Sequence, residues 1–207
     1  SQVSAGKKIS SLNLNYKKSN LIAVKKPVFP FNKFPNQKIF LSPEMKSTGE
    51  VIGFDKHLGS AYLKAEIGSG NRLPKQGTIF ISVNQNDKNE IIKIARDFNE
   101  IDFKIIATSG TSQLLNENGI ISKNIFKVGE GRPHIVDAIK NNEINLIINT
   151  PLGEQSRYDE YKIGKAAIEY KIPVITTLAG AHAALRAIRF EDKKLTYNSL
   201  QEIFHEK

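Results

Sequence analysis

The sequence predicts an α/β fold: a doubly wound, five-stranded parallel sheet preceded by an incomplete α+β segment. From Arg72 onward, short apolar runs alternate with segments of helical periodicity. Parallel strands need crossover connections, and right-handed crossovers through helices cover both faces of a sheet. The region before Arg72 lacks this alternation, so it is expected to be a different structural unit.

The first unit has too few elements for a core of its own. We expect a helix near residues 1–10, a strand at 21–28, a strand within "STGEVIGF" at 47–54, and a helix at 56–67 that ends with Gly68 as its C′ residue. Two or three strands and one long helix cannot close a core. We therefore interpret residues 1–70 as the end of a larger domain, expected to pack on chain that precedes Ser1.

A turn-rich linker, "GSGNRLPKQG" at residues 68–77, separates the two units, which predicts a second domain at residues 71–207. The expected strands of that domain are 78–83, 104–107, 125–128, 146–149 and 174–176, and the expected helices are 87–100, 112–118, 135–141, 161–170 and 179–190. In the first helix Ile91, Ile92, Ala95 and Phe98 form an apolar stripe, and Asp87 with Glu90 fits a capping box.

Composition excludes several function classes. The chain has 207 residues, no cysteine and four scattered histidines, so disulfides, thiol nucleophiles and a zinc centre are not expected. No apolar run is long enough to span a membrane and no signal peptide is present, which predicts a cytoplasmic protein. The net charge of +9 is spread along the chain without a basic helix or RNA-binding motif. It favours small anionic ligands over nucleic acid.

The expected ligand site lies at the carboxyl edge of the sheet, where helix N-termini present N–H groups to anions. Thr108, Ser109, Gly110 and Thr111 leave the second strand of the sheet and enter a helix. Three polar residues are expected at the same edge: Lys88, Lys127 and Asn149. A phosphate is the natural ligand for such a group. The alternative is that "TSGT" is a strand-to-helix turn with an N-cap and that each lysine is a solvated surface charge.

Catalytic residues are not predicted. Arg132 and His134 could contact an anion, but structural roles explain them equally well. Asp159 and Glu160 lie in a polar stretch expected to be a solvated loop, and no Ser-His-Asp or paired-carboxylate arrangement follows from the spacing. The remaining histidines, at positions 57, 182 and 205, have no plausible partners nearby in the sequence, so no role is assigned to them.

Several motifs resemble those of one family, and they occur in the order and spacing of that family. They are "PFNKFP" (30–35), "SPEMKSTGEVIG" (42–53), "ATSGT" (107–111), "KVGEGRPHIVDAIKN" (127–141), "LIINTPLG" (146–153) and "ITTLAGA" (175–181). Together they resemble the C-terminal end of the large subunit of carbamoyl-phosphate synthetase, over nearly the whole chain.

The resemblance implies that residues 1–70 are the end of the second ATP-grasp unit. Residues 71–207 would then be the allosteric domain with the methylglyoxal-synthase fold. In the family, the enzyme is a cytoplasmic ligase that joins bicarbonate and ammonia from a glutaminase small subunit, with ATP, Mg²⁺ or Mn²⁺, and K⁺. Its product, carbamoyl phosphate, enters pyrimidine and arginine biosynthesis. The resemblance places no catalytic residue, metal ligand or cofactor in this segment, which is expected to be inactive alone.

The resemblance also implies a nucleotide-effector pocket for UMP or IMP. Its residues would be Lys88, Thr108, Ser109, Gly110, Thr111, Lys127, Asn149 and Ile163. The 108–111 turn and Lys88 would hold the phosphate, and Lys127 with Asn149 the ribose or base. Which effector acts, and in which direction, is left open.

This sequence departs from the family pattern at four places. Pro151 and Glu160 replace hydroxyl residues of the pocket, which is expected to alter UMP affinity. Lys26 replaces a glutamate that binds the amino group of ornithine, so ornithine activation is not expected although Asp159 and Thr176 match other ornithine-site positions. Lys46 replaces an arginine and loses its planar fork.

Two other functions are compatible with the sequence. A free-standing lyase of the methylglyoxal-synthase type would need an acidic base after the fourth strand of the sheet, where "LGEQS" offers only Glu154. The domain could also be a structural module that joins subunits into a homo-oligomer.

Overall fold

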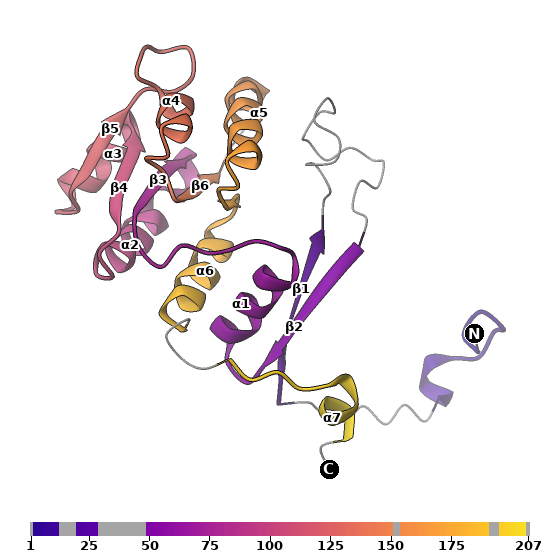
Figure 1. The fold of residues 1–207 in the computed structure, drawn as a ribbon. Helices are drawn as coiled ribbons and strands as arrows, with labels where there is room; N and C mark the ends of the chain where they lie inside the picture. The colour runs from indigo at the N-terminus through magenta and orange to yellow at the C-terminus, as the bar shows by residue number, and fades with distance from the viewer. Residues whose placement is uncertain (1, 13–19, 29–48, 151–153, 191–194, 206–207) are drawn as a thin grey trace.

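Most of the chain forms a parallel sheet with helices on both faces (Figure 1). The structure is a computed structural model that describes residues 2–12, 20–28, 49–150, 154–190 and 195–205, without the side chains of 154–157 and 204–205. The strands of the sheet are β3 (Thr78–Val83), β4 (Lys104–Thr108), β5 (Ser122–Ile125), β6 (Leu146–Thr150) and β7 (Val174–Ile175).

The strand order is β5-β4-β3-β6-β7, and every neighbouring pair is parallel. The chain runs outward from the central β3 through β4 to β5, returns to β6 on the other side of β3, and continues to β7. The direction of winding therefore reverses between β3 and β6. In sheets of this type the carboxyl ends of the strands diverge at the reversal and leave a crevice for ligands. The doubly wound, five-stranded class predicted from the sequence is confirmed.

Two helical layers cover the sheet. The helices are α2 (Lys88–Asn99), α3 (Ser109–Glu117), α4 (Ile135–Lys140), α5 (Glu154–Glu169) and α6 (Leu178–Phe190). Residues of α2, α3 and α6 join one apolar cluster, and residues of α4 and α5 join the other. The strands alternate between these clusters, so that Ile79 and Ile81 of β3 face the first and Phe80 faces the second. This alternation follows from the two-residue period of a strand.

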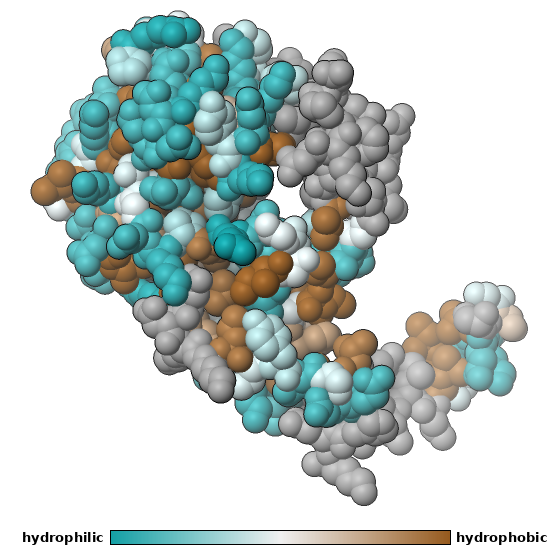
Figure 2. All heavy atoms as spheres, in the orientation of Figure 1, coloured by the Kyte–Doolittle hydropathy of each residue, from teal (hydrophilic) through white to brown (hydrophobic). Residues whose placement is uncertain are grey.

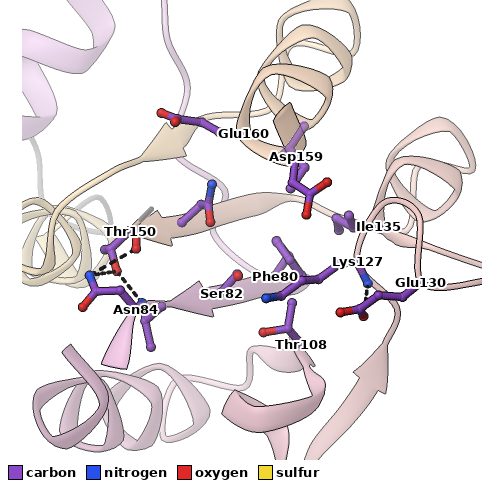
Figure 3. A pocket seen from close by; sticks show the side chains of 13 residues that line it. Phe80, Ser82, Asn84, Thr108, Lys127, Glu130, Ile135, Thr150, Asp159 and Glu160 are labelled. Atoms are coloured by element: carbon purple, nitrogen blue, oxygen red, sulfur yellow. Dashed lines mark hydrogen bonds between the residues drawn. The ribbon is translucent and has the colours of Figure 1, made fainter. Parts of the chain in front are cut away.

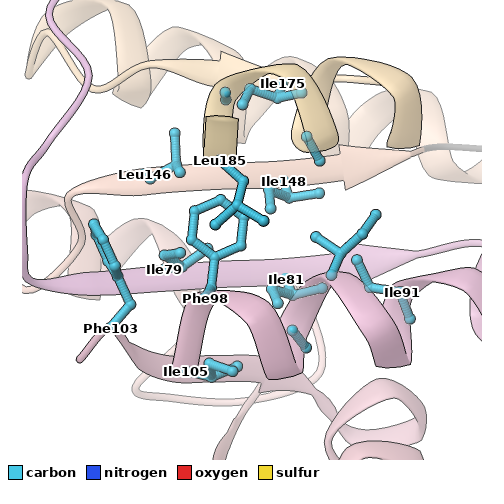
Figure 4. Close-up of a cluster of buried hydrophobic side chains, with 14 of the residues drawn as sticks. Ile79, Ile81, Ile91, Phe98, Phe103, Ile105, Leu146, Ile148, Ile175 and Leu185 are labelled. Atoms are coloured by element: carbon cyan, nitrogen blue, oxygen red, sulfur yellow. The ribbon is translucent and has the colours of Figure 1, made fainter. Parts of the chain in front are cut away.

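The larger cluster lies between β3, β6 and the helices α2 and α6 (Figure 4). Phe98 and Phe103 meet edge to face there, with ring centroids 5.6 Å apart. Complete burial of a side chain of this size stabilises the fold by about 1.5–3 kcal/mol. The stripe predicted on α2 is buried as expected, except that Ile92 is only partly buried. The stripe also includes Ile94, which we did not predict.

The segment before the sheet contains a two-stranded antiparallel sheet, a helix and one short turn of helix. Its elements are a 3₁₀ helix (Ile9–Ser11), β1 (Ile22–Val28), β2 (Gly49–Asp55) and α1 (Leu58–Gly68). The longer helix expected near residues 1–10 is wrong for the part that the structure describes, where only this single 3₁₀ turn forms. A short helix, α7 (Leu200–His205), lies near the end of the chain.

Helix α1 packs closely on both of its neighbours, and two glycines make this possible. A Cβ added at Gly53 of β2 would lie 2.0 Å from the carbonyl oxygen of Ala61. A Cβ at Gly59 of α1 would lie 2.4 Å from the carbonyl oxygen of Arg186 in α6. Both positions thus exclude any side chain, and α1 joins the β1–β2 hairpin to the helical layer of the large sheet. The proposed domain boundary at 70/71 stays a prediction.

The hairpin is also tied to α1 by an ion pair. The Lys26 ammonium on β1 contacts the carboxylate of Glu66, whose side chain is only 4% exposed. Asn71 donates a second hydrogen bond to this carboxylate at 3.1 Å. Lys26, which departs from the family pattern, therefore has an internal partner in this chain.

Several element boundaries differ from the prediction. β5 spans residues 122–125 rather than 125–128, and Phe126, which we had placed in the strand, is 42% exposed beyond its end. α3 begins at Ser109 rather than Ser112, so the "TSGT" residues form its first turn. α5 begins at Glu154 rather than Tyr161, because the polar stretch we read as a loop is helical.

Two of the predicted helix ends are also corrected. Asp87 precedes α2 but makes no side-chain capping bond, so the capping box with Glu90 is wrong. A capping box forms instead at α4, where His134 and Asp137 exchange hydrogen bonds. After α1 the left-handed residue is Gly70, with φ +82°, rather than Gly68, which is the last helical residue.

The surface is polar over most of the large sheet domain and more apolar beside the hairpin. Figure 2 shows apolar side chains gathered around the β1, β2 and α1 region. Ile22 of β1 and Ile52 of β2 are 38% and 53% exposed, and Ile67 of α1 is 46% exposed. The motifs at 30–35 and 42–48, with Lys46, lie outside the described residues.

Candidate functional site

A pocket of about 420 Å³ opens at the carboxyl edge of the sheet, at the reversal between β3 and β6 (Figure 3). The ends of β3, β4 and β6, the loop after β5, and α5 provide its walls. It is lined by Phe80, Ser82, Val83, Asn84, Thr108, Lys127, Glu130, Ile135, Asn149, Thr150, Asp159, Glu160 and Ile163. The mixture of apolar and polar residues is typical of a small-molecule site.

One end of the pocket is held by a network around Asn84, directly after β3. The Asn84 side-chain amide donates to the Thr150 carbonyl at 3.2 Å and to Asp87 Oδ2 at 2.6 Å. Its oxygen accepts from the backbone N–H of Asn86 at 2.8 Å. Because these bonds use the amide fully, Asn84 shapes the wall and fixes the distance between the ends of β3 and β6.

Asn149, on the neighbouring strand β6, differs from Asn84 in its hydrogen bonding. It is only 8% exposed and lines the pocket, yet its side-chain amide has no hydrogen-bond partner among the residues that the structure describes. Buried polar side chains are hydrogen-bonded in the large majority of cases, and leaving one unpaired costs about 1–3 kcal/mol. An unpaired buried amide facing a pocket therefore indicates a place where a ligand binds.

The turn from β4 into α3 lies beside the pocket. Thr108 lines the pocket and is buried, as is Thr111, and their hydroxyl oxygens are 3.4 Å apart. Ser109 and Gly110 are exposed. The Lys88 ammonium lies above this turn, 3.4 Å from the position that a Cβ of Gly110 would occupy. A cation and the N-terminus of α3 thus meet at one place, which favours an anion.

The loop after β5 closes another side of the pocket. It begins with the bridge between Phe126 and His134 and brings Lys127 and Glu130 to the pocket wall. The backbone N–H of Lys127 donates to Glu130 Oε2 at 2.9 Å, which holds the loop in shape. In Figure 3 the Lys127 side chain extends across the pocket between Asp159 and Thr108.

Helix α5 contributes Asp159, Glu160 and Ile163 to the remaining wall. Burial raises the pKa of Asp159, an effect that Glu130 increases and that Lys127 and Lys162 oppose. Asp159 takes part in no hydrogen bond or ion pair with any other described residue. The pocket therefore contains a partly desolvated carboxylate as well as an ammonium group.

The structure brings together part of the predicted site directly. Thr108, Lys127, Asn149 and Ile163 all line the pocket. The other four predicted residues, Lys88, Ser109, Gly110 and Thr111, are not part of its lining. Ser109, Gly110 and Thr111 form the adjacent first turn of α3, and Lys88, at the start of α2, places its ammonium beside Gly110. The role of all eight in binding an effector stays a prediction.

Sequence reasoning missed the residues at the end of β3, Thr150 at the end of β6, and Glu130 in the loop after β5. Ser82, Asn84 and Thr150 follow from the strand ends, and their polar side chains at the end of apolar runs were the available signal. Asp159 and Glu160, which we expected to lie in a solvated loop, are on a helix and line the pocket.

Other candidate residues have structural partners or lie elsewhere. Arg132 and His134 both contact Asp137, at 3.5 Å and 3.0 Å, and His134 caps α4. His182 has no partner nearby in sequence, but its Nε2 lies 3.3 Å from Oε1 of the distant Glu90. The side chain of Glu154 and the whole of Pro151 lie outside the described residues.

The pocket suits binding through hydrogen bonds and charge. Among the described residues, no group of three or more His, Cys, Asp or Glu side chains could hold a metal ion. No described helix is long and apolar enough to cross a bilayer.

Comparisons with known proteins agree on the relationship of this chain. The family described as "MGS-like domain" matches residues 90–176, which include most of the pocket walls. A "Carbamoyl phosphate synthase large chain" from Archaeoglobus fulgidus is 50% identical over 204 residues, covering 97% of this chain and 19% of that protein. The corresponding protein of Nostoc sp. is 46% identical over 204 residues, covering 98% of this chain and 18% of that protein.

The chain belongs to the carbamoyl phosphate synthase large-chain family. It matches the C-terminal part: a "Carbamoyl phosphate synthase large chain, C-terminal section" from Aquifex aeolicus is 45% identical over 195 residues, covering 91% of this chain and 36% of that protein. The chain thus spans about a fifth to a third of the length of these carbamoyl phosphate synthase relatives. A methylglyoxal synthase from Elizabethkingia anophelis NUHP1 superposes with a TM-score of 0.45 at 17% identity, covering 55% of this chain and 79% of the other.

Proposed function

We propose that this chain is the regulatory C-terminal part of a carbamoyl phosphate synthase large chain, and that its pocket binds a nucleoside monophosphate effector of the UMP class. The effector would control ATP-dependent synthesis of carbamoyl phosphate from bicarbonate and glutamine-derived ammonia. The glutaminase small subunit is the expected partner in the whole enzyme, and ATP with Mg²⁺ or Mn²⁺ and K⁺ would act outside this segment.

The unpaired amide of Asn149 is the observation that carries the proposal. It is buried in a pocket at the switch point of the sheet, where Thr108 and Lys127 also line the wall. The start of α3 and the ammonium of Lys88 lie next to this wall and favour a phosphate. A ligand with a phosphate at one end and polar groups along its length would meet all of these residues at once.

Calorimetric titration of the 207-residue chain with UMP tests the binding. We expect heat of binding, and we expect Lys127→Ala to weaken the affinity by roughly 10- to 100-fold, because a charge-assisted hydrogen bond contributes about 1.5–3 kcal/mol. Lys123→Ala is the matched control: Lys123 is an exposed residue of β5, four positions earlier, and does not line the pocket. Absence of UMP binding by a folded sample would refute the effector pocket.

The regulatory part of the proposal needs the whole large chain with its small subunit. Saturating UMP is expected to change the ATP concentration that supports half-maximal synthesis, and ATP should change UMP affinity by the same factor because coupling between two sites is reciprocal. Lys127→Ala should remove the response to UMP while leaving activity without UMP unchanged. The Lys26–Glu66 ion pair supports our expectation that ornithine does not activate this protein.

A further inference from the structure

The strongest unexplained group in the pocket is the carboxylate of Asp159. It projects from α5 toward the pocket in Figure 3, on the far side of Lys127 from Thr108. It has no hydrogen-bond or ion-pair partner among the described residues. Burial raises the pKa of Asp159, which is the sign of a carboxylate that has lost water without gaining donors.

The charges near Asp159 decide what kind of donor it would accept. Lys127 and Lys162 act on it as cations and Glu130 as an anion, and Glu160 also lines the pocket, so two ammonium groups already lie close to Asp159 without a hydrogen bond to it. A ligand ammonium placed here would be repelled by both lysines. A ligand phosphate would be repelled by Asp159 itself and has a better place at the α3 turn, beside Lys88. Uncharged hydroxyl donors are the remaining partners.

We propose that Asp159 reads the ribose of the ligand, its two carboxylate oxygens accepting hydrogen bonds from the vicinal 2′ and 3′ hydroxyls while the phosphate lies at the 108–111 turn. This inference rests on the proposed function, because it assigns one contact of the same ligand. A carboxylate that binds a ribose hydroxyl next to a helix-terminal phosphate site is a recurrent solution in doubly wound sheets. It would make the pocket selective for ribonucleotides over deoxyribonucleotides.

The test compares UMP with its 2′-deoxy analogue, dUMP, by calorimetry on the 207-residue chain. The two ligands share base and phosphate, so their affinity ratio isolates the 2′ hydroxyl. We expect UMP to bind at least 10-fold more tightly. Asp159→Asn keeps the size of the side chain but removes its charge, and it should reduce this preference to about 3-fold or less, because a hydrogen bond to a charged group is stronger than one to a neutral group.

Glu160→Gln serves as the matched control. Glu160 is adjacent in sequence and lines the same pocket, so its variant tests whether removing any carboxylate from the wall has the effect. It should leave the ratio of UMP to dUMP affinities within about 2-fold of the unmodified chain. Far-UV circular dichroism checks that each variant is folded, and the comparison of UMP with dUMP on the unmodified chain needs no variant at all.

The possible results separate the two proposals. Equal binding of UMP and dUMP overturns the assignment of Asp159 and leaves the effector pocket standing. A ribose preference that survives Asp159→Asn, or that Glu160→Gln reduces equally, also overturns it. Failure of both nucleotides to bind a folded chain overturns the assignment together with the proposed function.

Discussion

Replacing Lys26 by methionine should destabilise the folded chain through the partner that it leaves behind. Glu66 has a side chain only 4% exposed, whereas the side chain of Lys26 is 27% exposed. After the change, the Glu66 carboxylate keeps a hydrogen bond from Asn71 and the nearby hydroxyl of Tyr62 but loses its counter-ion. Methionine fills much the same space as the lysine stem, so the effect reports on charge.

The magnitude follows from burial. Removing one partner of a fully buried ion pair costs about 3–5 kcal/mol, because the other charge remains buried and uncompensated. Since water reaches Lys26 in part, we expect about 2–3 kcal/mol for Lys26→Met. For a chain of this length, that corresponds to a fall in melting temperature of roughly 5–10 °C.

Urea and thermal unfolding followed by far-UV circular dichroism provide the measurement. Glu66→Gln alone should cost less, about 1 kcal/mol, because its amide oxygen still accepts from Asn71. In the double variant no charge stays buried, so Lys26→Met with Glu66→Gln should be more stable than Lys26→Met alone. A loss under about 0.5 kcal/mol for Lys26→Met, or strictly additive effects in the double variant, would refute the reasoning.

Two further predictions concern the elements that α1 joins. Gly59→Ala should destabilise the chain by about 1–3 kcal/mol or more in chemical unfolding, because the new Cβ would lie 2.4 Å from the Arg186 carbonyl oxygen. Gly164→Ala is the control and should not destabilise the chain, since a Cβ there meets nothing within 4 Å. Equal stability of the two variants would contradict the close contact at Gly59. Although burial raises the pKa of Asp55, hydrogen bonds from Lys64, Ser60 and the His57 N–H outweigh it and lower the pKa from 3.8 to about 2. Because the pKa of Asp55 is lower in the folded chain than in the unfolded chain, its ionised carboxylate stabilises the fold at pH values above the unfolded-state pKa. This stabilisation is lost as the pH falls from about 4 to 2, so the unfolding midpoint of Asp55→Asn should depend less on pH in that window. Parallel pH profiles of the variant and the unmodified chain would contradict this assignment.

The central strands could be predicted from the sequence because both of their faces are buried. β3 was predicted with its observed bounds, 78–83, since its residues read as a continuous apolar run. The predicted position of β5 was three residues too far along the chain, because this strand is not buried on both faces. It is an edge strand with one neighbour, polar residues suffice along it, and the apolar Phe126 that attracted the prediction is exposed beyond its end.

The helix starts were harder to predict, for local reasons. α5 begins in a polar stretch that carries no apolar stripe, so periodicity could not reveal its first two turns. His134 is an unusual capping residue; its backbone forms a bridge with Phe126 and its ring accepts from the Asp137 N–H, which the sequence pattern did not indicate. The rim of the pocket could be predicted from strand ends, because parallel strands place these ends together. That Asp159 points into the pocket could not be predicted, because its direction depends on residues 154–169 being helical.

The residues around the pocket are separated by more than eighty positions in the chain, from Phe80 to Ile163. They face one another only after β3, β4, β6 and α5 have assembled, so a ligand bound there would bridge the two halves of the winding and would have no equivalent place in the unfolded chain. At one hundred times its dissociation constant, such a compound raises the free energy of unfolding by about 2.7 kcal/mol. Melting curves recorded with a panel of nucleotides would therefore show which of them bind the proposed effector pocket, without any assay of carbamoyl phosphate.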